Sequence, residues 1–121
     1  MSLKIQFVEY PKCSTCQKAK KWLEAQKIEF EDRHIKENPP TCEELKSWYE
    51  ISGLPLKKFF NTSGMLYKEM QLKDKLGAMS EDEQLRLLAT NGMLVKRPII
   101  VDGTTVLTGF KETEWEEKLR S

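Results

Sequence analysis

The sequence predicts an α/β protein of the α+β kind, in which a strand–helix–strand segment and a strand–strand–helix segment flank a helical middle. Runs of β-forming residues lie near the two ends of the chain, and capped helical patterns lie between them. The 121 residues fit one domain with a single core, and they contain no internal repeat or low-complexity linker. We therefore expect one domain over residues 1–121, with a helical insertion at about 41–92.

The first segment is predicted to form a strand, a turn, a helix and a second strand. Residues 5–10 are rich in β-formers and stop at Pro11. Good helix formers then occupy residues 14–26, with Ala19, Trp22 and Leu23 on one face. Apolar and acidic residues alternate over 28–32, which favours a second strand.

Capping boxes define the helices of the middle. Thr41 and Glu44 have capping-box spacing, so a helix is expected over 42–51, with Gly53 as its C-cap. Periodicity is weak over residues 53–77, which are expected to form short helices and loops. Ser80 and Glu83 form a second capping box, which begins a helix that Asn91-Gly92 ends.

The last segment is predicted to form a hairpin and a closing helix. Residues 98–101 and 104–107 are apolar or β-branched, and Asp102-Gly103 between them favours a tight turn. Residues 111–119 are expected to form the final helix.

Composition excludes several classes of function. Twenty Lys+Arg against nineteen Asp+Glu give a net charge of +1, which disfavours direct nucleic-acid binding. No apolar run reaches the length of a membrane span, and residues 1–4 lack the apolar core of a signal peptide. We expect a cytoplasmic monomer, where three cysteines favour catalysis, redox sensing or metal binding over a disulfide scaffold.

A Cys-x-x-Cys motif, Cys13 to Cys16, joins the first strand to the first helix, and this context favours a thioredoxin-like fold. Thiolate is the reactive form of cysteine, and a helix N-terminus lowers the thiol pKa. Cys13 has that position, and Lys12 adds a positive charge beside it. We assign Cys13 as the nucleophile and the more shielded Cys16 as the resolving thiol.

Two other interpretations of the motif remain open: half of a structural zinc site, or a pair of inert buried thiols. Zinc takes four ligands, commonly as two pairs, and Cys42 and His34 form no second pair at ligand spacing. No bound metal is therefore expected. Cys42 is interpreted as a small filler residue and His34 as a structural histidine.

Arg97-Pro98 precedes the first strand of the hairpin. A cis bond is compatible with this position, although the residues alone do not establish it. The Arg97 guanidinium would stabilise a thiolate or bind an oxyanion if it faced the Cys-x-x-Cys motif, and it would otherwise be a surface arginine. Both alternatives stay open at this level.

The chain resembles the ArsC/Spx family, which contains glutaredoxin-type arsenate reductases and Spx transcriptional regulators. Three motifs carry the resemblance: the residues from Tyr10 to Cys16, the Glu37-Asn38-Pro39-Pro40 turn, and Lys96-Arg97-Pro98-Ile99-Ile100-Val101. The resemblance covers essentially the whole chain. It implies a thioredoxin fold with a helical insertion, and a cis Pro98 that presents substrate beside the redox cysteine.

The family divides by activity. In its arsenate reductases the cysteine that matches Cys13 attacks arsenate with the help of arginines; Arg97 matches one of them, whereas Asn61 and Gly109 occupy the positions of two others. Spx-like regulators keep the cysteine pair as a redox switch and bind the C-terminal domain of the RNA polymerase α subunit. Gly53 aligns with a glycine at that interface, although a helix C-cap explains the residue equally well.

The expected function is that of an arsenate reductase-like thiol–disulfide oxidoreductase using Cys13 and Cys16, with Arg97 as a third catalytic residue and with Lys12 and Pro98 presenting thiol and substrate. Its substrate is expected to be a disulfide, a mixed disulfide or an oxyanion. No bound cofactor is expected, and the reductant is external: thioredoxin, glutaredoxin or a low-molecular-weight thiol. The alternative is an Spx-like redox-sensing regulator that binds the RNA polymerase α subunit.

Overall fold

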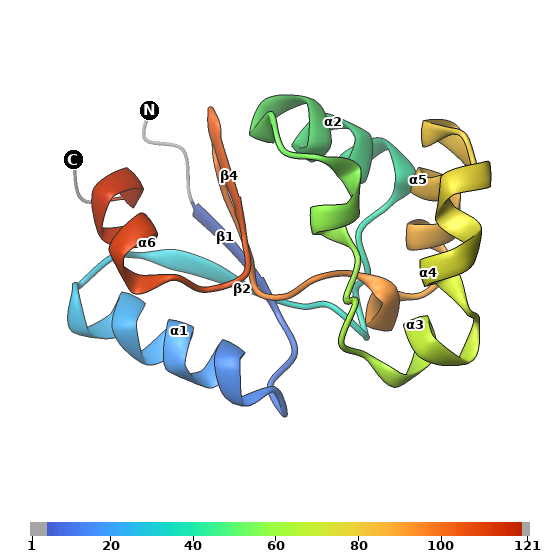
Figure 1. Cartoon of the computed structure of the whole chain (residues 1–121). Helices are drawn as coiled ribbons and strands as arrows, with labels where there is room; N and C mark the ends of the chain where they lie inside the picture. The colour runs from blue at the N-terminus through green and yellow to red at the C-terminus, as the bar shows by residue number, and fades with distance from the viewer. Residues whose placement is uncertain (1–4, 120–121) are drawn as a thin grey trace. The chain divides into compact units, whose positions relative to one another are not determined.

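A computed structural model describes residues 5–119, which divide into two compact units (Figure 1). The sheet unit comprises the described residues up to His34 together with those from Arg97 onward. The helical unit comprises Ile35–Lys96. No helix within residues 5–119 has the length and apolar character needed to cross a membrane.

The sheet unit contains one four-stranded mixed sheet with the order β2-β1-β3-β4. Strand β1 pairs in parallel with β2 and antiparallel with β3, which in turn pairs antiparallel with β4. This is the topology of a thioredoxin-like fold, as expected. The strands are β1 (Ile5–Glu9), β2 (Phe30–His34), β3 (Ile99–Asp102) and β4 (Thr105–Thr108).

Two helices cover one face of this sheet, α1 (Ser14–Ala25) and α6 (Glu112–Leu119). The pairing register aligns Phe7, Ile100 and Leu107 in one row across the sheet. Figure 1 shows α1 and α6 beside the strands. Both helices contribute apolar side chains to the buried cluster that contains this row. The buried cluster consists of Phe7, Ala19, Trp22, Leu23, Ile100, Leu107 and Trp115.

Trp115 holds the centre of this core. Its ring makes edge-to-face contacts with Phe7, Trp22 and Phe110, at centroid distances of 6.4, 6.0 and 4.8 Å. The indole N–H, which would be costly to bury unpaired, donates to the carbonyl of Gly109 at 3.1 Å. The fully buried Trp115 therefore joins α6 both to the sheet and to the loop after β4.

The helical unit is built from short helices, and α2 packs beside α5. Both expected capping boxes are present, Thr41 with Glu44 at α2 and Ser80 with Glu83 at α5. The segment of weak periodicity contains short α- and 3₁₀-helices, as expected. The elements are α2 (Cys42–Ser52), η1 (Leu56–Phe59), α3 (Met65–Glu69), α4 (Leu72–Lys75), η2 (Leu76–Ala78), α5 (Glu81–Ala89) and η3 (Gly92–Leu94).

The second strand was predicted over residues 28–32, whereas β2 begins at Phe30 and ends at His34. The reason is the way α1 ends: Lys27 has a φ of 58°, and the Ile28 amide donates to the Leu23 carbonyl at 3.0 Å. This closing bond of a helix C-terminus keeps Ile28 out of the strand.

The hairpin turn also differs by one residue from the prediction. Asp102 pairs with Thr105, so Asp102 belongs to β3 and the loop is Gly103-Thr104. Gly103 has a positive φ of 55°, which suits the first position of this loop.

Candidate active site

Cys13 occupies the N-cap of α1, directly after the loop that follows β1. Its amide donates to the Tyr10 carbonyl at 2.9 Å, and its carbonyl accepts the first helical bond from Gln17 at 3.0 Å. The Gln17 side chain also donates to the Pro11 carbonyl at 2.8 Å. The loop is therefore closed on both sides of the thiol, which is half-buried and free.

The surroundings of Cys13 favour its thiolate. Partial burial acts to raise the pKa, but it is outweighed by hydrogen bonds from the backbone and thiol of Cys16 and from the backbone of Thr15. The positive charge of Arg97 acts in the same direction, so the pKa of Cys13 lies below its ordinary value. A lowered pKa increases the fraction of reactive thiolate near neutral pH.

Cys16 lies one helical turn further along α1 in a contrasting environment. It is fully buried, and burial is the main reason that its pKa is raised to about 12. The charges of Cys13 and Glu9 act in the same direction, against a hydrogen bond with the backbone of Tyr10. One thiol is poised to attack and its neighbour is held protonated, which is the asymmetry that a nucleophile and a resolving thiol require.

Arg97 lies on the same side of the sheet unit as the cysteine loop. Its guanidinium carbon is 5.3 Å from the centroid of the Tyr10 ring, in a cation–π arrangement. Together with its influence on the pKa of Cys13, this contact favours an arginine that faces the thiol over a plain surface arginine. The Arg97–Pro98 bond is cis, as the resemblance implied.

Pro98 and Gly109 meet beside this site. Pro98 is buried, and its carbonyl accepts the Gly109 amide at 2.8 Å. Gly109 has a φ of 75°, a conformation that favours glycine, and it also holds the Trp115 indole. Gly109 therefore serves as a backbone junction between Pro98 and Trp115.

The remaining predicted residues lie in several settings. Lys12 is exposed in the cysteine loop. His34 ends β2, and its ring packs edge-to-face on Tyr10 at 5.8 Å. Cys42 begins α2 in the helical unit, where it is half-buried and free. Asn61 also belongs to the helical unit, and its amide donates to the Leu94 carbonyl at 2.7 Å.

Gly53 forms the C-cap of α2 with a φ of 68°, as the capping interpretation requires. Among the described residues, no heavy atom outside its immediate chain neighbours lies within 4 Å of where a Cβ would be, so the space is open, while the positive φ strains any larger side chain placed there. Its role in binding a partner stays a prediction.

A charged cluster beneath α1 was not anticipated from the sequence. Glu9, the last residue of β1, is 2% exposed, and Lys20 of α1 lies 3.9 Å from its carboxylate and 2.8 Å from that of Asp32. One signal in the sequence could have indicated it. Glu9 lies two residues after Phe7 in β1, and alternation along a strand places both side chains on the same, inward face.

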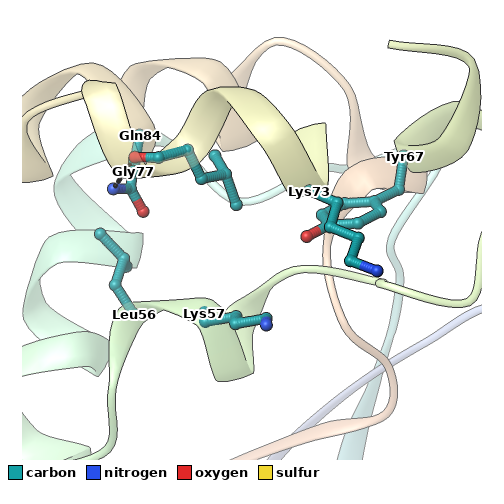
Figure 2. A pocket seen from close by; sticks show the side chains of 7 residues that line it. Leu56, Lys57, Tyr67, Lys73, Gly77 and Gln84 are labelled. Atoms are coloured by element: carbon teal, nitrogen blue, oxygen red, sulfur yellow. Dashed lines mark hydrogen bonds between the residues drawn. The ribbon is translucent and has the colours of Figure 1, made fainter. Parts of the chain in front are cut away.

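Figure 2 shows a pocket of about 340 Å³ in the helical unit. The side chains of Lys57, Lys73 and Tyr67 are among those that line it. None of the predicted catalytic residues lines this pocket. The lining residues are Leu56, Lys57, Tyr67, Lys73, Leu76, Gly77 and Gln84.

Within residues 5–119, no group of three or more His, Cys, Asp or Glu side chains is arranged to hold a metal ion. The geometry therefore gives no support to the zinc interpretation of the Cys13 and Cys16 pair. The arrangement is instead suited to exchange between two thiols and a disulfide.

Known proteins are similar to this chain over nearly its whole length. A model of the ArsC family matches residues 8–118. YusI of Bacillus subtilis is 61% identical over 115 residues, covering 95% of this chain and 98% of that protein. The regulatory protein MgsR of Bacillus subtilis is 33% identical, covering 94% and 89%. The global transcriptional regulator Spx of Streptococcus pneumoniae is 30% identical, covering 86% and 77%.

Solved structures show the same similarity. The crystal structure of a Bacteroides fragilis protein described as ArsC family related has a TM-score of 0.93 at 58% identity, covering 97% of this chain and 98% of that one. An arsenate reductase from Vibrio cholerae has a TM-score of 0.82 at 27% identity, covering 99% and 98%.

Proposed function

Since this chain belongs to the ArsC family, we propose that it is a cytoplasmic thiol–disulfide oxidoreductase whose redox centre is the Cys13 and Cys16 pair. The observation that carries the proposal is the asymmetry of the pair: the pKa of Cys13 is lowered at the N-cap of α1, whereas burial raises that of Cys16 to about 12.

The proposed cycle has three steps. The Cys13 thiolate attacks one sulfur of an oxidised substrate, forms a mixed disulfide and releases the other sulfur as a thiol. Cys16 then loses its proton and attacks the Cys13 sulfur, which closes the intramolecular disulfide and releases the reduced substrate. An external dithiol of thioredoxin or glutaredoxin, or two molecules of a low-molecular-weight thiol, returns both cysteines to the reduced form and leaves as a disulfide.

A disulfide or a mixed disulfide is the preferred substrate class. Arsenate would need a fork of donors around its oxygens, as arginine guanidinium groups supply. Arg97 offers one such group, but Asn61 and Gly109 stand at the two other positions where the family's reductases carry arginine. The internal resolving thiol Cys16 suits disulfide exchange directly.

The test is a trapping experiment in host lysate. A Cys16→Ser bait keeps the nucleophile but cannot resolve the mixed disulfide, so substrate proteins should remain attached until reductant is added. A matched bait with Cys13→Ser and Cys16→Ser should retain none of them. Mass spectrometry of the reductant eluates identifies the partners, and equal capture by both baits would refute a Cys13-based exchange.

The second candidate is a redox-sensing regulator that binds the C-terminal domain of the RNA polymerase α subunit. It is supported by the similarity to MgsR and Spx, which are named as regulators. Gly53 and the open space around it are the proposed contact.

For this candidate, Gly53→Arg should abolish binding of the purified α-subunit domain in titration calorimetry. Gly53→Asn, which tolerates a positive φ, controls for backbone strain. Binding by the wild type with no effect of Gly53→Arg would remove Gly53 from the interface, and no binding by the wild type would remove this candidate.

A further inference from the structure

Glu9, Lys20 and Asp32 form a charged cluster under the first turns of α1. Glu9 ends β1 on the face that α1 covers, and its side chain is 3% exposed. Lys20 lies one helical turn beyond Cys16, so both project from the same side of α1. Its ammonium group bridges the two carboxylates, at 3.9 Å from Glu9 and 2.8 Å from Asp32.

The two acids of the cluster have pKa values shifted in opposite directions, so Glu9 holds a proton more strongly than Asp32 does. Burial, helped by the neighbouring Asp32, raises the pKa of Glu9 to about 8. Burial also acts to raise the pKa of Asp32, but hydrogen bonds from protonated Glu9 and from Lys20 hold it below its usual value. Glu9 is therefore the group of this cluster that gains and loses a proton near neutral pH.

Within residues 5–119, the titratable groups beside Glu9 come from α1 and β2. Cys16 and Lys20 lie on α1, and Asp32 and His34 lie on β2, where His34 is paired with Glu9 in the strand register. On the other side, the β3 residues that pair with β1 are Ile99, Ile100 and Val101. The charge of Glu9 reaches Cys16, since it contributes to the raised pKa of that thiol.

We propose that Glu9 is the proton acceptor for the Cys16 thiol when the Cys13 mixed disulfide is resolved, and the proton donor to Cys16 when the disulfide is reduced. The inference rests on the proposed function, because it assigns a role within the same exchange cycle. A buried thiol has no direct route to solvent, so its proton needs an acceptor inside the protein.

The step balances as follows. The Cys16 thiol gives its proton to the Glu9 carboxylate while its sulfur forms a bond to the Cys13 sulfur. The bond between Cys13 and the substrate sulfur breaks, and the substrate leaves as a thiolate with the bonding electron pair. In the return step an external thiolate attacks Cys13, and Cys16 leaves as a thiolate that takes the proton back from Glu9. A second external thiolate then attacks the external sulfur of this mixed disulfide and releases the Cys13 thiolate.

The test uses dithiobis(nitrobenzoate), a small disulfide that requires no knowledge of the natural substrate, on protein with Cys42→Ser. Attack by Cys13 releases one coloured nitrobenzoate thiolate, and closure by Cys16 releases the second, so stopped-flow absorbance separates the two phases. Glu9→Gln should slow the second phase by about tenfold or more near pH 7. Glu31→Gln, exposed on the opposite face of β2, is the matched control and should leave both phases unchanged.

Electrostatic repulsion alone predicts the opposite result. Removing the negative charge of Glu9 should lower the pKa of Cys16, which thiolate absorbance measures in protein with Cys13→Ser and Cys42→Ser. If Glu9 only repelled the thiolate, closure would then be faster in Glu9→Gln. Slower closure together with a lower thiol pKa supports proton transfer, whereas equal or faster closure, or an unchanged pKa, overturns it.

The pH profile gives an independent readout. The wild-type closure rate should rise as Glu9 ionises through about pH 8, and Glu9→Gln should lose this inflection. If the wild type shows no second phase at any pH, the Cys13 and Cys16 pair itself fails, and with it the proposed function. If closure occurs but ignores Glu9, this inference alone fails.

Discussion

The sheet unit and the helical unit differ in how far apart their interacting residues lie along the chain. In the helical unit, α2 and α5 each begin with a capping box whose two partners are three residues apart. In the sheet unit, β1 pairs with β3, although the sequence between these two strands contains α1, β2 and the entire helical unit, Ile35–Lys96. Local signals therefore specify one unit and long-range pairing specifies the other.

The proposed chemistry follows the same division. The sheet unit brings Glu9, Cys13 and Arg97 to one end of its strands from opposite ends of the sequence. The helical unit contributes capped helices, a small pocket and an open C-cap. Long-range contact is what builds a buried, asymmetric environment, and the following predictions test whether reactivity and stability are divided in this way.

The largest expected effect concerns the two half-buried cysteines, one in each unit. Cys13→Ser should reduce turnover of a disulfide substrate by at least about a thousandfold, because serine cannot form the mixed disulfide. Cys42→Ser should leave turnover unchanged. Steady-state assays of both variants make the comparison, and a large loss on changing Cys42 would place reactivity in the helical unit as well.

The core of the sheet unit should respond strongly to truncation. Trp115→Ala should lower the free energy of unfolding by about 3–5 kcal/mol, since it leaves a large cavity among Phe7, Trp22 and Phe110. Chemical denaturation measures the change. Glu117→Ala, on the exposed side of the same helix, should stay within about 0.5 kcal/mol of the wild type; a similar loss in both variants would mean that α6 tolerates neither change.

The charged cluster should make stability depend on pH. Because the pKa of Glu9 is raised from 4.5 to about 8, the folded protein holds a proton that the unfolded chain has lost between these values. Its contribution is complete below about pH 4.5 and declines as pH rises to about 8, with a slope of at most about 1.4 kcal/mol per pH unit.

Denaturation at several pH values should show this decline in the wild type and a flatter profile in Glu9→Gln. Asp32 has a lowered pKa and acts with the opposite sign at more acidic pH, outside this window. An unchanged slope in Glu9→Gln would exclude Glu9 as its source.

The smallest effects should come from the local signals of the helical unit. Thr41→Ala and Ser80→Ala should each cost about 1 kcal/mol, because each removes the side-chain acceptor of a capping box. Ser63→Ala, in the exposed loop before α3, is the control. Urea denaturation measures all three, and effects no larger than that of the control would show that the boxes are dispensable.

The same division explains what could be predicted from the sequence. The capped helices and the order of helices and strands along the chain could be predicted, because a cap or a β-rich run is formed by residues adjacent in sequence. The start of β2 was predicted too early because the helix-closing bond from Ile28 to Leu23 depends on a positive φ at Lys27. Lysine rarely adopts this conformation, so the sequence gives no sign of it. The hairpin turn was misplaced because pairing extends β3 through Asp102.

The candidate site was predictable in part for a related reason. The position of Cys13 at a helix start follows from local pattern, and so does the greater shielding of Cys16. The cluster of Glu9, Lys20 and Asp32 joins two strands and a helix, and only the parallel register of β1 and β2 brings its acids together. The spacing of these residues along the sequence does not predict that register.

The packing of Trp115 against Trp22 also gives the sheet unit an optical signal of its own. The two indoles lie 6.0 Å apart with their planes at 76°, a geometry in which their electronic transitions couple. Trp48 of α2, 4% exposed, is the indole of the helical unit. A Trp48→Phe variant would therefore report by fluorescence and near-ultraviolet circular dichroism on the sheet unit alone, and Trp22, on the same helix as Cys16, makes that report sensitive to the state of the thiols.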